Sequence, residues 1–270
     1  MVIALRSLAA VGRNDLFHQR QQALRLWISL RRKSPAAVLQ VLRLSRQPPT
    51  WALYARFLRE SRRSLTCSHL APFDARRLAA VARALSLNLP NERLSTTELE
   101  IAACVAAAEA DVFLGRPLRA DQDLKKLIPD RASIADRALR AEVARVLGVI
   151  EYELGRFPQA ALRFEEAFLD LGLFAPRRRR AYLLACRARA LAAFHPERAR
   201  QAFDAVLEEL ELLAFPRLAV AVHLARVDLA QAEGDLDQAL AALGTARRQF
   251  GQLKEVSETE RLALDWRRAL

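Results

Sequence analysis

The sequence predicts an all-α protein built from helical hairpins that repeat about every 40 residues. Leucine, alanine, arginine and glutamate dominate the 270 residues, only 8 glycines are present, and runs of Val, Ile and Thr bounded by turns are few. This composition favours helices over strands. Breaks in the apolar pattern also recur at similar intervals, at Gly115, Gly155, the Phe194-His195 pair and Gly234.

Three series of small or apolar residues share one period. The first places an alanine where the two helices of a hairpin would meet, at spacings of 40, 39 and 40 residues. The other two follow four and seven residues later. The series are Ala120, Ala160, Ala199 and Ala239; Leu124, Phe164, Phe203 and Leu243; and Leu127, Ala167, Val206 and Ala246. Their coincidence indicates tandem structural repeats.

The repeat is clearest in the stretch AEVARVLGVIEYELGRFPQAALRFEEAFLDLG, residues 141–172. Gly148 and Ala160 have almost no side chain, so two helix backbones can approach closely there. Gly155 can adopt a positive φ and end the first helix. Phe157 and Phe164 then fill the wedge between this hairpin and the next. One hairpin cannot bury its apolar faces alone, so it needs neighbours.

This stretch resembles the tetratricopeptide (TPR) repeat: two glycines, an aromatic residue after the turn, and Ala/Phe/Ala at helical spacing. The resemblance implies a TPR-like α-solenoid, a right-handed superhelix of antiparallel helical hairpins, from about Ser95 to the end of the chain. A period near 40 instead of the usual 34 implies longer helices. The third repeat departs from the pattern, because Phe194-His195-Pro196 replaces the glycine turn and Arg187 stands where Gly148 would be.

The chain is expected to divide into a basic helical part, residues 1–90, and a TPR-like repeat domain, residues 91–270. Residues 87–95, with Pro90, are the best boundary. The first part is expected to form helices at 14–33, 34–45, 50–63 and 74–87, whose alternating lengths also fit two degenerate repeats. Trp27 and Leu30, with Leu24 and Ile28, supply the apolar side of the first helix.

The hairpins of the repeat domain follow in order, with Thr96, Ser133 and Asp235 as helix starts. They pair 96–114 with 118–128, 132–154 with 158–171, 176–194 with 197–213, and 217–233 with 236–250. A last helix at 258–270 closes the array as a C-terminal cap.

The formal charge of +12 lies entirely in the first third of the chain. Residues 1–90 hold 16 basic and 3 acidic residues, a net charge of +13, so the rest of the chain sums to −1. No acidic residue occurs between Leu16 and Arg59. Scarce lysine suggests a GC-rich genome, but that does not explain the missing carboxylates. A basic patch of this kind points to phosphates or an acidic partner.

The candidate polyanion contacts are Arg31, Arg32, Lys33, Arg62 and Arg63, together with the run Arg177, Arg178, Arg179 and Arg180. Residues 34–59 have a helix-turn-helix cadence, but Pro48-Pro49 stands at the start of the would-be recognition helix and no turn glycine is present. The aromatic residues among these arginines fit better as core. The positive run at 177–180 opposes the helix dipole, so helix stability does not account for it.

The TPR resemblance implies that a partner binds on the concave face, which the first helix of each pair lines. By position, Glu109, Arg145, Val149, Tyr152 and Asp228 would face it. The expected function is that of a non-catalytic scaffold or adaptor for a protein or peptide. The alternative is a nucleic-acid-binding or transcription-regulatory protein that uses the basic N-terminal part, since elongated TPR-like arrays occur in bacterial regulators.

No catalytic motif supports an enzyme: the sequence has no GxGxxG, P-loop, HExxH or GxSxG pattern. The four histidines are scattered, and Cys67, Cys104 and Cys186 are isolated, with only Cys67 and His69 close in sequence. No cofactor and no metal are therefore expected. No stretch of about 18 residues lacks charge, so no membrane span is expected either, and the predicted location is the cytoplasm.

Overall fold

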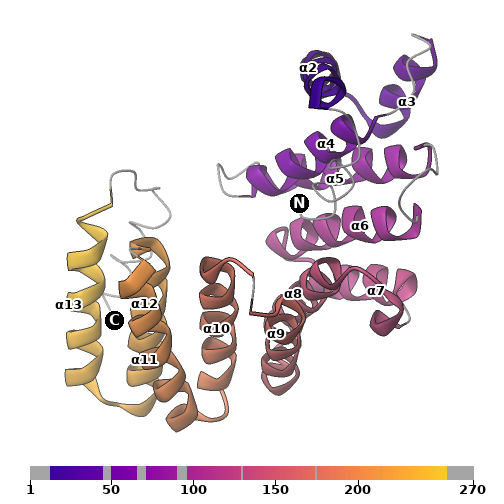
Figure 1. The fold of residues 1–270 in the computed structure, drawn as a ribbon. Coiled ribbons are helices and arrows are strands. Elements are labelled where there is room, and N and C mark those ends of the chain that lie inside the picture. The colour runs from indigo at the N-terminus through magenta and orange to yellow at the C-terminus, as the bar shows by residue number, and fades with distance from the viewer. Residues whose placement is uncertain are drawn as a thin grey trace. The chain divides into compact units, whose positions relative to one another are not determined.

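A computed structural model describes residues 13–44, 50–65, 71–89, 96–128, 130–173, 175–213 and 215–253. Over these residues the protein is all-helical, with twelve α-helices, one short 3-10 helix and no strand, which confirms the predicted all-α class. The chain divides into two compact units, unit 1 (Met1–Leu154) and unit 2 (Gly155–Leu270). From α4 (Trp51–Ser64) onward, helices adjacent in sequence within a unit pack together (Figure 1).

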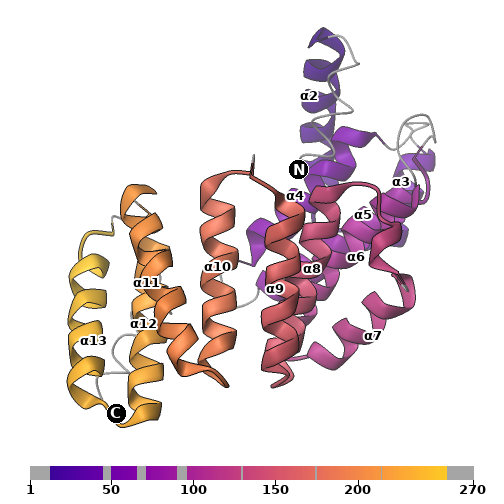
Figure 2. The same cartoon turned by 60° about the horizontal axis from the view of Figure 1, so that its bottom comes forward.

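Unit 1 begins with two helices and continues with pairs. Its described helices are α2 (Arg13–Leu30), α3 (Pro35–Leu44), α4 (Trp51–Ser64), α5 (Ala71–Ser86), α6 (Thr96–Phe113), α7 (Pro117–Leu127), η1 (Arg131–Ser133) and α8 (Arg137–Glu153). From α4 to α8 each α-helix packs on the next, and contacts also join α2 to α4, α3 to α5, α4 to α6 and α6 to α8. Figures 1 and 2 show α4, α5 and α6 side by side. Helix pairs in this unit therefore follow one another in sequence order.

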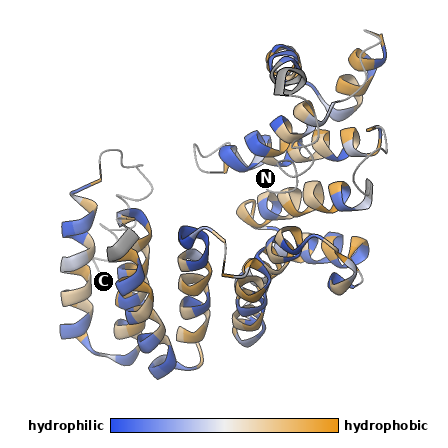
Figure 3. Ribbon diagram, viewed as in Figure 1, coloured by the Kyte–Doolittle hydropathy of each residue, from blue (hydrophilic) through white to orange (hydrophobic). Residues whose placement is uncertain are grey.

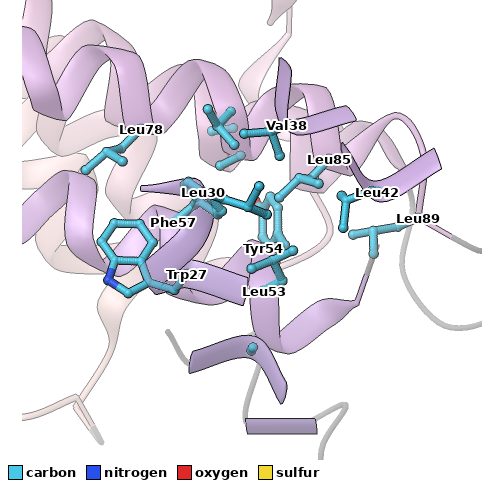
Figure 4. Packing of buried hydrophobic residues seen from close by; sticks show 14 of the residues in the cluster. Trp27, Leu30, Val38, Leu42, Leu53, Tyr54, Phe57, Leu78, Leu85 and Leu89 are labelled. Carbon is cyan, nitrogen blue, oxygen red and sulfur yellow. The ribbon is translucent and has the colours of Figure 1, made fainter. Parts of the chain in front are cut away.

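Large side chains fill the core formed by α2, α3, α4 and α5 (Figure 4). Phe57 on α4 is fully buried, and the Trp27 ring meets it edge-on with 5.0 Å between the ring centroids. The hydroxyl of buried Tyr54 donates a hydrogen bond of 2.8 Å to the carbonyl oxygen of Leu99 on α6. Burial raises the pKa of the Tyr54 phenol, so the group stays a neutral donor.

Leu99 and Ala103 of α6 also belong to this core cluster, so apolar packing continues past the predicted boundary at 87–95. Residues 90–95 lie outside the described residues. The division into parts 1–90 and 91–270 stays a prediction.

A second cluster in unit 1 lies among α6, α7 and α8. Val105, Leu124 and Ile150 are buried at its centre, together with Ile134 from the segment before α8. Ala120, one of the repeating alanines, is fully buried on α7. Together these side chains fix α7 and α8 against α6, which makes α6 the central helix of this part.

Unit 2 is a series of antiparallel neighbours. Its described helices are α9 (Phe157–Leu171), α10 (Arg177–Ala192), α11 (Pro196–Leu213), α12 (Pro216–Glu233) and α13 (Leu236–Phe250). Each packs on the next, and α10 also contacts α12. Alanine dominates the core between α12 and α13, where Ala230, Ala239, Ala242 and Ala246 are buried with Val227 and Leu243.

The predicted repeat positions are buried or form turns. Gly115, Gly155 and Gly234 have φ of 71°, 74° and 78°, the left-handed region in which glycine ends a helix without strain. The buried positions are Gly148, Ala160, Phe164, Ala167, Ala199, Phe203 and Ala239, and Phe157 is half-buried. The helix turn without glycine, at Phe194-His195, follows the end of α10 at Ala192.

Two local predictions were wrong. α8 begins at Arg137 and not near Ser133, because the Asp136 carboxylate accepts hydrogen bonds from the backbone N–H groups of Ala138 and Leu139 and so caps the helix. On α2, Leu24 and Ile28 are exposed by 45% and 61%, since the helix turns Trp27 and Leu30 toward α4 instead. The predicted helix at 258–270, Pro48-Pro49, Cys67 and His69 lie outside the described residues.

Candidate partner-binding surface

The candidate site is a surface shared by α4, α6 and α8 of unit 1, here called the first-helix surface. It consists of Arg62, Glu109, Glu142, Arg145, Val149 and Tyr152. On α8, Glu142, Arg145, Val149 and Tyr152 follow at intervals of three, four and three residues, a spacing that places them on one side of a helix. All six side chains are half-buried.

A network of ion pairs joins the three helices at this surface. The Arg145 guanidinium contacts Glu109 of α6 at 2.7 Å and Glu142 of its own helix at 2.9 Å. Arg62 of α4 contacts the same Glu142 carboxylate at 3.0 Å. The four side chains keep only 13–29% of their surface exposed. Shielding from water strengthens such pairs relative to fully exposed ones, so the network fixes the positions of all four groups.

The carboxylates of Glu109 and Glu142 are each paired with a guanidinium at this surface. Val149 and Tyr152 add an apolar and an aromatic group one and two helical turns beyond Arg145. The Nε of Arg62 is buried and has no hydrogen-bond partner among the described residues.

Two further ion pairs hold α5 against α6. The Arg76 Nε lies 2.6 Å from a carboxylate oxygen of buried Asp111. Arg83 donates through Nε and a terminal nitrogen to Glu100, at 3.0 and 2.7 Å, and these hydrogen bonds raise the pKa of its guanidinium. Arg62, Arg76 and Arg83 therefore tie neighbouring helices of unit 1 together.

The predicted polyanion contacts do not form a single set. Arg31, Arg32 and Lys33 are exposed in the turn that follows α2, and Arg63 is exposed at the end of α4. Arg62 instead belongs to the ion-pair network with Glu142. The sequence placed it beside Arg63, but one position on a helix is a rotation of about 100°, so the two side chains leave α4 in different directions.

The arginine run in unit 2 partly packs against aromatic rings. The guanidinium of Arg178 lies over the Phe215 ring and that of Arg180 over the Phe168 ring, each at 5.1 Å from the ring centroid. Arg177 and Arg179 are exposed in the hydrophilic first turn of α10 (Figure 3). Two of the four residues thus have a structural role.

Sequence reasoning missed Glu142, the carboxylate that links Arg62 to Arg145. Its position three residues before Arg145 on one helix was the available signal. Asp228 is exposed on α12 in unit 2, whereas the other predicted partner contacts belong to unit 1.

The isolated cysteines and histidines form no site among the described residues, where no three His, Cys, Asp or Glu side chains are placed to hold a metal. Cys104 is buried, and this burial raises the pKa of its thiol. His18 and His195 are exposed, and His223 is buried. Within the same part of the chain, no helix has both the length and the apolar character needed to cross a membrane.

Comparisons with protein-family models, with curated proteins and with solved structures found no match to this chain.

Proposed function

We propose that this chain is a non-catalytic, TPR-like scaffold that binds a protein or peptide partner through the first-helix surface. The observation that carries the proposal is the ion-pair network of Arg62, Glu109, Glu142 and Arg145. It joins α4, α6 and α8 of unit 1 into one fixed polar surface. A partner would meet groups that are already oriented, so it would lose little entropy in ordering them.

The helix contacts support a solenoid arrangement within each unit. In a TPR-like array the first helix of a pair packs on its own second helix and on the first helix of the next pair. The contacts α4–α5, α6–α7, α4–α6 and α6–α8 follow this pattern in unit 1. The contacts α10–α11, α12–α13 and α10–α12 follow it in unit 2. We therefore propose right-handed superhelical stacking of these pairs.

The chemistry of the surface favours a particular kind of partner. Charges of both signs alternate across α4, α6 and α8, and Val149 and Tyr152 lie next to them. An amphipathic peptide with one apolar anchor and flanking polar groups would complement this pattern, because its side chains could pack on Val149 while its polar groups meet the network. A polyanion would not, since each guanidinium here already has a carboxylate within 3.0 Å.

Site-specific photo-crosslinking in cells tests this proposal. A benzophenone amino acid placed at Tyr152 should form adducts with a defined protein, and those adducts should persist after nuclease treatment. The matched control places the same group at Leu118, which is 60% exposed on α7, a second helix of a pair. Equal adducts at both positions, or adducts only with nucleic acid, would contradict the proposal.

A substitution then checks the surface with the captured partner. Val149→Arg should weaken binding by about tenfold or more, because a charge would replace the apolar contact. Leu118→Arg is the matched control and should leave binding unchanged. Circular dichroism of both variants shows whether the fold is kept, and Tyr152→Ala offers a second, smaller change at the same surface.

A further inference from the structure

Two sets of basic residues can be distinguished on α2 to α5 and in the turn after α2. Five arginines on α4 and α5 have a carboxylate partner within 3.2 Å: Arg56, Arg62, Arg76, Arg77 and Arg83. Seven other basic residues are exposed and make no ion pair within the described residues: Arg20, Arg25, Arg31, Arg32, Lys33, Arg43 and Arg59. The excess positive charge of the first third of the chain therefore resides mainly in this second set.

Most of the second set lies on one helix and the turn after it. Arg20 and Arg25 are on α2, and Arg31, Arg32 and Lys33 follow directly. We call these five residues the α2 basic surface. From Arg20 to its end at Leu30, α2 rises about 15 Å at 1.5 Å per residue, and the other three basic residues follow in the turn.

The packing of α2 holds these charges in place. Ala23, Trp27 and Leu30 are buried against α4 and its neighbours. Arg25 lies on the side of α2 opposite these residues, and Arg20 is exposed at the edge of the buried side. The turn is fixed as well, because the Arg77 guanidinium on α5 donates a hydrogen bond of 3.0 Å to the carbonyl oxygen of Lys33. The α2 basic surface is thus part of the folded scaffold and not a loose tail.

Helix stability accounts for only part of this charge. Arg31, Arg32 and Lys33 follow the C-terminus of α2, where the helix dipole favours cations. Arg20 and Arg25 lie within the helix, and no acidic residue stands three or four positions from either of them. Like charges held together without carboxylates repel one another, so this surface is built for something other than stability.

We propose that the α2 basic surface binds the phosphate backbone of a nucleic acid, without reading its sequence. Four of its five residues are arginines, whose planar guanidinium donates two parallel hydrogen bonds to a phosphate. Among the described aromatic rings on α2 and α4, Trp27, Tyr54 and Phe57 are buried and Trp51 is half-buried, so these rings are poorly placed to stack on bases. Contact is therefore made to phosphates and not to bases.

A nucleic acid fits this surface better than an anionic membrane. Among the α2 side chains that the structure describes, the exposed aliphatic ones are Leu24 and Ile28, one turn apart and flanked by arginines. These two side chains alone do not form the continuous face of bulky apolar residues that a helix lying in a membrane interface presents. This binding site is separate from the first-helix surface, so either proposal stands or falls without the other.

The test is a salt titration of a labelled single-stranded RNA and of a DNA duplex against the full chain. The variant Arg25→Gln/Arg31→Gln/Arg32→Gln removes three exposed charges. On the single-stranded RNA, the plot of log affinity against log salt should become shallower by about 2 in slope, because about three phosphate contacts are lost. Binding should also weaken about tenfold or more at moderate salt. Arg116→Gln/Arg198→Gln/Arg247→Gln is the matched control, since it removes three exposed charges outside the candidate polyanion contacts and gives the same net charge.

An equal loss in both variants would mean that only net charge matters, and this would overturn the proposal. Failure of the unchanged protein to bind either nucleic acid near physiological salt would also overturn it. Vesicles of phosphatidylglycerol and phosphatidylcholine provide a third outcome. Tighter binding to them than to RNA, lost in Leu24→Ser/Ile28→Ser, would assign the surface to membranes. Should the triple variant fail to fold, Arg20→Gln/Arg25→Gln tests the helix portion alone.

Discussion

The core around α4 and the core between α12 and α13 are built in opposite ways. Around α4 the buried side chains are large, with Trp27 against Phe57 at 5.0 Å. Between α12 and α13 four of the six buried side chains are alanines. Small residues let two helix backbones approach closely, whereas large ones must interlock to fill the wider space between helices. The two ends of the chain thus gain stability from different sources, and four substitutions test this difference.

Phe57→Ala should have the largest effect. It removes a fully buried ring and leaves a cavity beside Trp27, which should cost about 3–5 kcal/mol of unfolding free energy. Urea denaturation measures it. Phe73→Ala is the matched control, because Phe73 is 58% exposed on α5, and it should cost far less. Equal losses would mean that the large-residue core is not the main support of this region.

Asp111→Asn tests whether unit 1 also depends on a buried charge. The side chain of Asp111 is only 2% exposed and is paired with Arg76, so losing the pair should cost about 1–3 kcal/mol. Asp74→Asn is the control, since Asp74 is 62% exposed beside Arg77 and its pair should contribute little. Thermal melts of the two variants compare them directly. If Asp74→Asn lowers the melting temperature as much as Asp111→Asn, burial does not explain the contribution of the Arg76–Asp111 pair to stability.

Ala246→Leu tests the small-residue core. Ala246 is fully buried on α13, so a larger side chain should force the helices apart and cost about 1–3 kcal/mol. Ala241→Leu lies on the exposed side of the same helix and should be nearly neutral. An Ala246→Leu variant as stable as the unchanged protein would show that α12 and α13 have room between them.

His223 should make a small, pH-dependent contribution in unit 2. Its Nδ1 is buried without a hydrogen-bond partner among the described residues, and burial, with Arg226 and Arg248, lowers the pKa of its imidazole. Below the ordinary value of about 6.5 the unfolded chain binds a proton that the folded chain resists, so stability is full above that pH and falls as the pH drops. The unfolding midpoint should therefore fall less from pH 7 to pH 5 in His223→Gln than in the unchanged protein. An identical pH dependence would show that His223 is not the group responsible.

The same difference between the two cores decides what could be predicted from the sequence. Where two helix backbones meet closely, only small residues fit, so Ala199 and Ala239 recur at a fixed period. This period made it possible to locate the hairpins in the sequence. Helix α13 has its predicted limits because Asp235 caps its start and Gly234 ends the helix before it. Around α4, side chains of several sizes fill the space, so no residue type recurs and no period could be seen there.

The candidate site was only partly predictable for a related reason. Glu142 and Arg145 are neighbours on one helix, so their pairing follows from spacing alone. Arg62 is 80 positions away from Glu142, and their contact depends on how α4 and α8 are placed in the folded unit. The sequence likewise showed an excess of arginine in the first third but not which arginines have carboxylate partners, since those carboxylates come from α5, α6 and α8 as well as α4.

The large-residue core has a consequence for how the protein is made. Its described members lie between Ala23 and Ala103, so all of them are synthesised before α12 and α13. This core needs no residue of unit 2 to be complete. It can therefore fold during translation, with its tryptophan and phenylalanine rings shielded before the alanine-lined helices of unit 2 are synthesised.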